Sequence, residues 1–254
     1  MRSSRRKDIA AYIARHRSVT MTELCEVFDV SMNTIRADVA FLTSTGTVEK
    51  IYGGVRSVPQ LEVPLFAQRT AIRPEAKLAI ARAAAGMIKD GDSVYIDAGT
   101  TAMHVIDMIS PDSHVTIITG NLYVVNQASL RQNIELIVLP GILNRRTNSV
   151  ADVSTLEYLG RYNFSKAVLG TTGLSYEGGL NVSSYLECEV KRKALQQSTE
   201  RILLCDSSKY GSTGLISYAS LADITRLITD SSCNDALRRL CAEKDTQLTV
   251  VNAD

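Results

Sequence analysis

Apolar residues recur every three or four positions in three short stretches at the start of the chain. This helical spacing predicts three helices, over about residues 4–15, 21–28 and 31–45. Thr20 and Glu23 have the spacing of a capping box at the start of the second helix, and Ser31 is a suitable N-cap for the third. Gly46 can end the third helix in a left-handed conformation. The short turn between the second and third helices is typical of a helix-turn-helix.

The segment that follows the third helix alternates weakly and contains Gly53-Gly54, which predicts two short strands joined by a tight turn. Three helices followed by a hairpin form a winged helix-turn-helix. In such a domain Ile35, Val39 and Leu42 anchor the third helix to the other two. The polar side near the start of that helix is then available to enter a major groove.

The polar residues of this surface are candidates for contact with DNA. Asn33 and Thr34 can reach base edges, and Arg36 can pair with guanine or with a phosphate. Residues of the hairpin can approach the DNA backbone. The predicted DNA-binding residues are Ser31, Asn33, Thr34, Arg36, Ala37, Lys50, Tyr52 and Arg56. The alternative is that these residues only solvate the surface of a small helical bundle.

Beyond residue 74, short and nearly continuous apolar segments alternate with helical patterns. The expected strands are residues 93–97, 115–119, 134–140, 166–170, 201–206, 226–230 and 247–252. The expected helices are residues 75–88, 102–109, 123–130, 185–199 and 234–242. Buried strands that alternate with helices indicate an α/β fold with a mainly parallel sheet covered on both faces.

The segment between these two regions has a broken apolar pattern and several prolines, so it is expected to be a linker. The expected domains are a winged helix-turn-helix DNA-binding domain over residues 1–57, a linker over 58–73 and an α/β effector-binding domain over 74–254.

Polar turns follow several of the expected strands, at the sheet edge where ligands collect in a parallel α/β fold. Residues 97–101, with the sequence DAGTT, lead from a strand into a helix. The backbone N–H groups of Gly99, Thr100 and Thr101 can therefore hold a phosphate. The other turns are residues 119–121, 140–141, 170–173 and 206–209. Each turn alone is equally an ordinary turn or N-cap, but together they predict a pocket for a phosphorylated polyol.

Charge is distributed unevenly along the chain, although the net charge is only +1. Residues 1–60 hold nine Lys/Arg and six Asp/Glu, whereas the remainder holds 19 and 21. A basic amino-terminal segment is compatible with nucleic-acid binding, but surface charge alone produces such imbalances too.

The composition, 45% apolar and 22% charged, is that of a globular protein. The five cysteines lack metal-binding spacing and no histidine cluster accompanies them, so neither a metal site nor a cofactor is expected. The longest apolar runs fall short of the roughly 18 residues that a membrane helix needs. The basic N-terminus lacks the apolar stretch of a signal peptide, so a cytoplasmic location is expected.

Residues 30–55, with the sequence VSMNTIRADVAFLTSTGTVEKIYGGV, resemble the signature of the DeoR family of bacterial transcriptional regulators. The residues that match the family pattern are Ser31, Thr34, Ile35, Arg36, Asp38, Gly46, Gly53 and Gly54. Ala37 stands where a second arginine is usual, and Tyr52 and Val55 replace a histidine and an alanine.

The larger region also resembles the effector domain of this family, which is similar in fold to ribose-5-phosphate isomerases. The resemblance is carried by stretches such as DAGTT, EGGLNVSSYLECEVKRKAL and ILLCDSSKYG. It implies that the effector is bound by Asp97, Gly99, Thr100, Thr101, Asn121, Gly141, Lys191, Asp206 and Lys209. For Lys191 the alternative is an ordinary exposed lysine on a helix.

Two functions fit these features: a transcriptional regulator, or a sugar-phosphate isomerase-like enzyme with an accessory DNA-binding domain. An isomerase needs an acid and a base placed at the substrate, and the sequence does not establish that pair. Glu187 and Glu189 lie on a charged helix, where we expect them to be solvated or structural.

We therefore expect a non-enzymatic repressor of a carbohydrate-utilisation operon that binds double-stranded operator DNA as a homodimer or homotetramer. A phosphorylated sugar or polyol is expected to release it. The linker around Pro59 and Pro64 is expected to relay that release.

Overall fold

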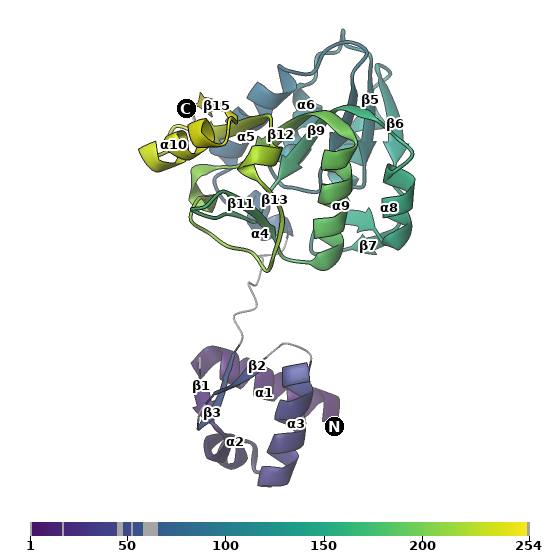
Figure 1. Ribbon diagram of the computed structural model, residues 1–254. Helices are drawn as coiled ribbons and strands as arrows, with labels where there is room; N and C mark the ends of the chain where they lie inside the picture. Colours follow the sequence, from purple (N-terminus) through teal and green to yellow (C-terminus); the bar gives the residue numbers. More distant parts are fainter. Residues whose placement is uncertain (1, 17, 45–47, 52, 58–65, 253–254) are drawn as a thin grey trace. The chain divides into compact units, whose positions relative to one another are not determined.

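The computed structural model of the chain describes residues 2–16, 18–44, 48–51, 53–57 and 66–252. The chain divides into two compact units, Met1–Glu62 and Val63–Asp254, whose elements are labelled in Figure 1.

The amino-terminal unit is a winged helix-turn-helix. Its elements are α1 (Arg2–His16), β1 (Ser18–Thr20), α2 (Met21–Phe28), α3 (Met32–Ser44), β2 (Val48–Ile51) and β3 (Gly54–Ser57). The three predicted helices and the hairpin are confirmed. Strand β1, where the sequence predicted only a break between helices, pairs with β3 and gives a sheet of order β1-β3-β2. Gly46, the predicted end of the third helix, lies outside the described residues.

Local capping explains where the helices of this unit begin. The Thr20 hydroxyl accepts a hydrogen bond from the backbone N–H of Glu23 at the start of α2, and the Ser31 hydroxyl accepts one from Thr34 at the start of α3. Asp29, with φ of 49°, ends α2 in the left-handed conformation. The apolar sides of the helices meet in a core that contains Ile9, Ile13, Leu24, Ile35, Val39 and Leu42.

The second unit is built on a parallel sheet of seven strands, in the order β15-β14-β12-β9-β4-β5-β6. The strands in chain order are β4 (Ser93–Ile96), β5 (Val115–Thr119), β6 (Ile134–Val138), β9 (Phe164–Gly170), β12 (Ser198–Leu204), β14 (Arg226–Asp230) and β15 (Gln247–Val251). The predicted fold class, a small helix-turn-helix domain followed by a larger parallel α/β domain, is confirmed.

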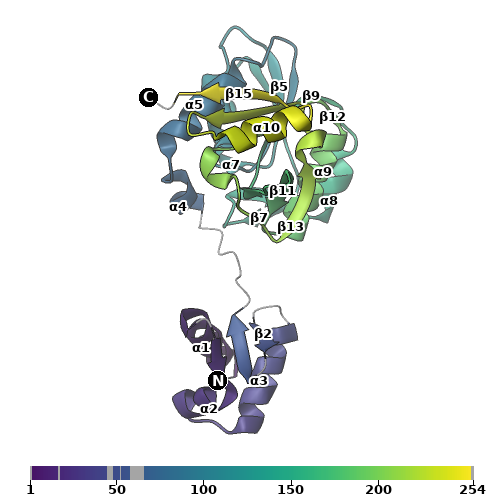
Figure 2. The same ribbon diagram turned by 60° about the vertical axis from the view of Figure 1, so that its left-hand side comes forward.

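Helices cover both faces of this sheet, as Figures 1 and 2 show from two directions. One face carries α5 (Pro74–Ala85), α6 (Val105–Met108) and α7 (Leu122–Ala128), and the other carries α8 (Val153–Leu159), α9 (Tyr185–Gln196) and α10 (Asp235–Glu243). Successive strand residues point to opposite faces, so Ile96 packs in the first core and Tyr95 in the second. The remaining helical segments are α4 (Phe66–Thr70), η1 (Ala102–His104), η2 (Ser207–Lys209) and η3 (Leu221–Asp223).

Short antiparallel strands that the sequence did not predict lie beside the main sheet. They are β10 (Gly173–Leu174), β11 (Gly179–Val182) and β13 (Ile216–Ser220), in the order β10-β11-β13. A separate ribbon pairs β7 (Ile142–Asn144) with β8 (Ser149–Ala151). These strands are short and rich in turn residues, so they lack the long apolar run that marks the central strands.

The strand order reverses at β4. On one side β4 pairs with β5, the next strand in the chain, and on the other side it pairs with β9. A doubly wound sheet leaves a crevice beyond the carboxyl ends of the strands at such a reversal. Asp97, which follows β4, and Gly170, which ends β9, lie at this point.

The close pairing of β1 with β3 leads to a prediction about Gly54. A Cβ atom at this position would lie 2.3 Å from the carbonyl oxygen of Val19, so Gly54→Ala must separate the two strands. We expect the thermal midpoint of the amino-terminal unit to fall by about 5 °C or more. Gly86→Ala is the control, because its φ is −63° and its nearest neighbours lie 3.6 Å away. Equal midpoints for Gly54→Ala and the wild type would contradict the tight pairing.

Candidate functional site

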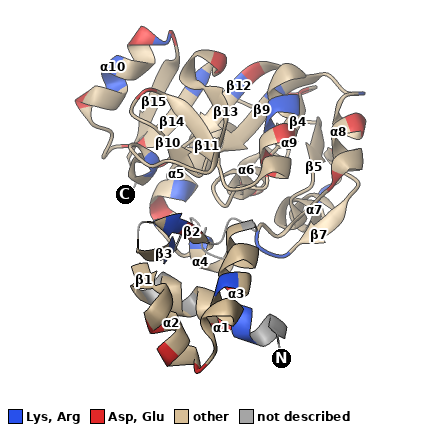
Figure 3. Ribbon diagram, turned by 60° about the horizontal axis from the view of Figure 1, so that its bottom comes forward, with Lys and Arg blue, Asp and Glu red and all other residues tan. Residues whose placement is uncertain are grey.

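The first turns of α3 present the predicted DNA-reading residues. Asn33, Arg36 and Ala37 are exposed, and Thr34 is half-buried. The hydroxyl oxygens of Ser31 and Thr34 are 2.9 Å apart, so Ser31 helps to fix the start of the helix. Figure 3 shows the basic residues of α1 and α3 in blue. The arrangement can present an amide, a hydroxyl and a guanidinium to a groove.

The hairpin supplies the remaining cationic candidates. Lys50 and Arg56 are both exposed. Arg56 forms an ion pair with Glu49, its register partner on β2. Because both side chains are solvent-exposed, this pair contributes little stability and a phosphate can replace the carboxylate. Tyr52 lies outside the described residues.

Asp38 joins the recognition helix α3 to α1. Its side chain is only 2% exposed, and the Nε atoms of Arg5 and Arg6 each donate a hydrogen bond of 2.8 Å to its carboxylate. Arg6 also lies over the ring of Phe41, 4.0 Å from its centroid. Burial acts to raise the pKa of Asp38, but the hydrogen bonds from the two guanidinium groups outweigh it and hold the pKa below its usual value. The sequence singled out Asp38 only as part of a motif.

The α/β unit contains a cavity of about 650 Å³ at the carboxyl edge of the sheet, a volume in the usual range for small-molecule sites. It lies between the end of β4, the β7–β8 ribbon and the start of α9. Its polar wall includes Asp97, Arg145, Arg146, Thr147, Ser149 and Glu187. Its apolar wall includes Leu139, Ile142, Leu143, Val150, Leu186 and Val190.

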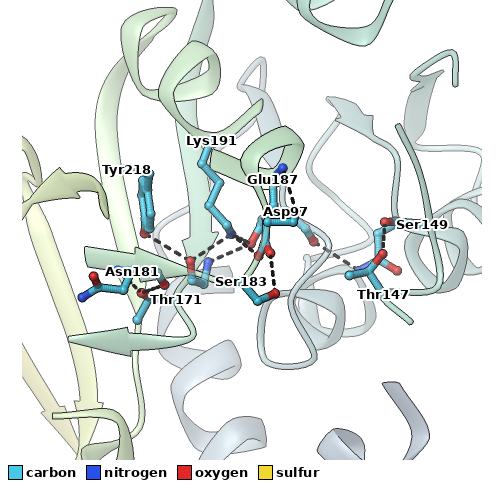
Figure 4. Close-up of polar contacts among 12 residues, drawn as sticks. Asp97, Thr147, Ser149, Thr171, Asn181, Ser183, Glu187, Lys191 and Tyr218 are labelled. Carbon is cyan, nitrogen blue, oxygen red and sulfur yellow. Dashed lines mark hydrogen bonds and ion pairs between the residues drawn. The ribbon is translucent and has the colours of Figure 1, made fainter. Parts of the chain in front are cut away.

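Lys191 is buried beside this cavity, as Figure 4 shows. Its side chain is 2% exposed, and its Nζ atom donates hydrogen bonds to Oδ2 of Asp97 and, at 2.9 Å, to the carbonyl oxygen of Gly170. The backbone N–H of Gly170 donates to the same Asp97 oxygen at 3.0 Å, and the Tyr218 hydroxyl donates to the Gly170 carbonyl. The alternative of an exposed helix lysine is therefore wrong, because Lys191 ties α9 to the ends of β4 and β9.

Glu187 lies one helical turn before Lys191 and lines the cavity. Its Oε1 atom is 3.8 Å from Nζ of Lys191. Burial raises the pKa of Glu187 above its usual value, and the nearby Asp97 adds to the rise while Lys191 opposes it. The sequence-based expectation that Glu187 is solvated or structural stays a prediction, because its side chain is 26% exposed and lies near Lys191. Glu189 forms an ion pair with Arg192.

Two further candidates support the cavity from behind. Asn121 is fully buried; its amide donates to the backbone oxygen of Asp97, and its side-chain oxygen accepts from Tyr123 at the start of α7. Gly141 has φ of +148°, and a Cβ there would lie 2.6 Å from the backbone of Ala151. It therefore permits close packing at the base of the β7–β8 ribbon.

The other candidates lie away from the cavity wall. Gly99, Thr100 and Thr101 form the turn between β4 and η1, and both threonines are buried. Asp206 accepts hydrogen bonds from Arg73 and from the backbone of Ser208. None of these, nor Lys209, is among the residues that line the described cavity. Their role in effector binding stays a prediction.

The sequence-based candidates omitted Arg145, Arg146 and Thr147 at the tip of the β7–β8 ribbon. The signal that could have indicated them is a pair of adjacent arginines within a turn that follows a strand. They add cationic and hydroxyl groups to the cavity that Asp97 and Glu187 also line.

Within the described part of the chain, no group of three or more His, Cys, Asp or Glu side chains is arranged to hold a metal ion. The five cysteines are unpaired thiols. No helix among the described residues is long and apolar enough to cross a membrane.

A helix-turn-helix unit followed by an α/β unit with a ligand-sized cavity is the architecture of a ligand-responsive transcriptional regulator. The chain matches the DeoR-like helix-turn-helix domain over residues 5–60 and the DeoR C terminal sensor domain over residues 72–231. It belongs to the DeoR family, and it is a DNA-binding transcriptional regulator rather than an enzyme. The two domains imply that it binds DNA and a small-molecule effector.

Several characterised proteins are similar over nearly the whole chain. The regulator IolR of Bacillus subtilis is 36% identical over 96% of this chain and 97% of its own. The repressor GlcR of the same organism is 31% identical, over 97% and 95%. The glycerol-3-phosphate regulon repressor of Escherichia coli is 27% identical, over 97% and 98%. Among solved structures, ribose 5-phosphate isomerase of Methanocaldococcus jannaschii matches 53% of each chain with 18% identity and a TM-score of 0.37.

The buried pair of Lys191 and Asp97 predicts a characteristic pattern of stabilities. Lys191→Met leaves a buried carboxylate without its counter-ion and should cost about 3–5 kcal/mol in free energy of unfolding. Asp97→Asn should also be strongly destabilising. The double variant should recover part of the loss, because neither charge remains. Urea unfolding of the α/β unit measures this, and single variants as stable as the wild type would show that the pair is not coupled.

The contacts of Asp38 predict that Asp38→Asn destabilises the amino-terminal unit by about 2 kcal/mol and weakens DNA binding through the orientation of α3. Because the folded-state pKa is lowered, the stabilisation is present at neutral pH and is lost as the pH falls below about 4. Asp29→Asn is the control, since Asn tolerates the left-handed conformation. Thermal unfolding against pH checks the prediction; a loss equal to that of the control would refute it.

Proposed function

We propose that this regulator represses a carbohydrate-utilisation operon and that a phosphorylated sugar or polyol, bound in the cavity of the α/β unit, releases it from its operator. The observation that carries the proposal is that acidic and basic residues line one ligand-sized cavity. The carboxylate residues Asp97 and Glu187 and the guanidinium residues Arg145 and Arg146 line the same cavity.

This mixed lining suits a ligand that carries both hydroxyls and a phosphate. Carboxylates accept hydrogen bonds from sugar hydroxyls, and guanidinium groups bind phosphate oxygens in pairs. Thr147 and Ser149 add hydroxyls beside the arginines. The names of two relatives agree with repression, since one is a repressor and the other represses a glycerol-3-phosphate regulon.

We propose that the protein acts in the cytoplasm as a homodimer or homotetramer. Two recognition helices on successive major-groove half-sites require two copies of the chain. The proposed domains are residues 1–57 for DNA binding and 74–254 for the effector, with a linker over 58–73. Helix α4 falls within the proposed linker and groups with the α/β unit. The linker prolines, Pro59 and Pro64, lie outside the described residues, and the relay through them is part of the proposal.

Release from DNA requires that the effector bind the DNA-free form more tightly than the DNA-bound form. The effector is not transformed in this scheme. Only the difference between its binding free energies for the DNA-free and DNA-bound forms favours release.

A thermal-shift screen against sugar phosphates and their dephosphorylated counterparts tests the effector class. A phosphorylated compound at about 100 times its Kd should stabilise the protein by about 2.7 kcal/mol. The dephosphorylated counterpart at the same concentration should have a much smaller effect. Stabilisation only by uncharged sugars would contradict the proposal.

The DNA interface is tested with Arg36→Ala and duplex DNA selected from a random pool by the wild-type protein. Loss of a base or phosphate contact should weaken binding by about 1–3 kcal/mol without a change in the unfolding midpoint. Arg161→Ala is the control, because Arg161 is exposed on the α/β unit and pairs only with nearby Glu157 among its described ion pairs. Unchanged retention of the duplex by Arg36→Ala would remove this residue from the interface.

A further inference from the structure

Arg69 lies on α4 and is not itself among the residues that line the cavity, but its side chain contacts one of them. Its Nη2 atom donates to the carbonyl oxygen of Arg146 at 3.4 Å, and Arg146 lines the cavity. Asp97 and Glu187 act electrostatically on the Arg69 guanidinium, so it shares the environment of the cavity's two carboxylates. No sequence motif distinguishes this arginine from the others.

The hydrogen-bonding capacity of this guanidinium is largely unused. Its Nε atom is buried and, within the described part of the chain, has no hydrogen-bond partner. The contact of Nη2 with Arg146 is at the long limit for a hydrogen bond. A buried donor without a partner costs about 1–3 kcal/mol. An arginine in this position is suited to bind an anion through its free N–H groups.

Neither nearby carboxylate satisfies Arg69. Oδ2 of Asp97 is bound by Lys191 and by the backbone of Gly170. Among the ion pairs of the described residues, Glu187 pairs with Lys191 and none involves Arg69. Burial lowers the pKa of Arg69, with the two carboxylates opposing the change. The side chain is therefore a partly buried cation with a buried, unpaired Nε atom, and its nearest acidic groups are already engaged.

The backbone of Arg69 is held in place by another lysine. Lys77, which is 4% exposed, donates a hydrogen bond from Nζ to the Arg69 carbonyl oxygen. Burial lowers the pKa of Lys77 to about 8. This contact anchors the end of α4 to α5 while the guanidinium points toward the β7–β8 ribbon.

We propose that Arg69 binds the anionic group of the ligand in the cavity. This inference rests on the proposed function. Two N–H groups of the guanidinium bind two oxygens of a phosphate, in place of the weak contact with the Arg146 carbonyl.

The competing explanation is that Arg69 only offsets the negative charge of Asp97 and Glu187. In that case its removal would destabilise the unliganded protein and leave phosphate affinity unchanged. The two explanations therefore differ in whether the effect depends on an added anion.

The test compares four full-length proteins: the wild type, Arg69→Gln, Arg69→Lys and the control Arg161→Gln. Each is titrated with inorganic phosphate, glycerol 3-phosphate and glycerol, and calorimetry and the ligand-induced shift in unfolding midpoint are recorded. We expect Arg69→Gln to weaken binding of both phosphate compounds at least tenfold. Arg69→Lys should have an intermediate effect, since it keeps the charge but loses the paired N–H groups. The control should match the wild type.

Wild-type affinity for both phosphate compounds in Arg69→Gln would overturn the inference and leave the proposed function standing. If Arg69→Gln does not fold, unchanged affinity in Arg69→Lys has the same meaning. A wild-type protein that binds neither these compounds nor any sugar phosphate of the screen contradicts the proposed function as well.

Discussion

The buried ion pair between Lys191 and Asp97 is the interaction on which the α/β unit depends. A charge removed from water is tolerated only when a counter-ion and hydrogen bonds replace the solvent. Here the ammonium group is shared by Asp97 and the carbonyl oxygen of Gly170. This places the end of β4, the end of β9 and helix α9 around one point. The point coincides with the reversal of strand order, which is why the cavity forms there.

The amino-terminal unit also contains a buried carboxylate that is paired with basic side chains. Asp38 is buried on α3 and is satisfied by Arg5 and Arg6 of α1. The ion pairs fix the inner side of the recognition helix, and its outer side keeps exposed polar groups for DNA. In both units a buried carboxylate orients the elements around a surface or cavity that is proposed to bind a partner.

Much of this fold was predictable because the signals are local. Strands β5 and β14 follow from short continuous apolar runs, and α2 follows from its cap and apolar stripe. The burial of Lys191 was not predictable, since its partner Asp97 is 94 residues away in the chain. The positions of Glu187 and Arg69 were also not predictable, because only the folded chain shows which charged side chains lie at or beside a cavity. The short strands β10 and β11 lack any periodic signal of their own.

The central claim is that a ligand in the α/β unit and DNA on the winged helix-turn-helix unit oppose each other's binding. Thermodynamic linkage requires the opposition to be reciprocal. The most direct measurement is the Kd of the stabilising sugar phosphate for the free protein and for the protein saturated with its selected duplex, beside the Kd of the duplex with and without that compound. The account predicts that both Kd values rise by the same factor. A duplex affinity that is unchanged at saturating sugar phosphate would contradict it.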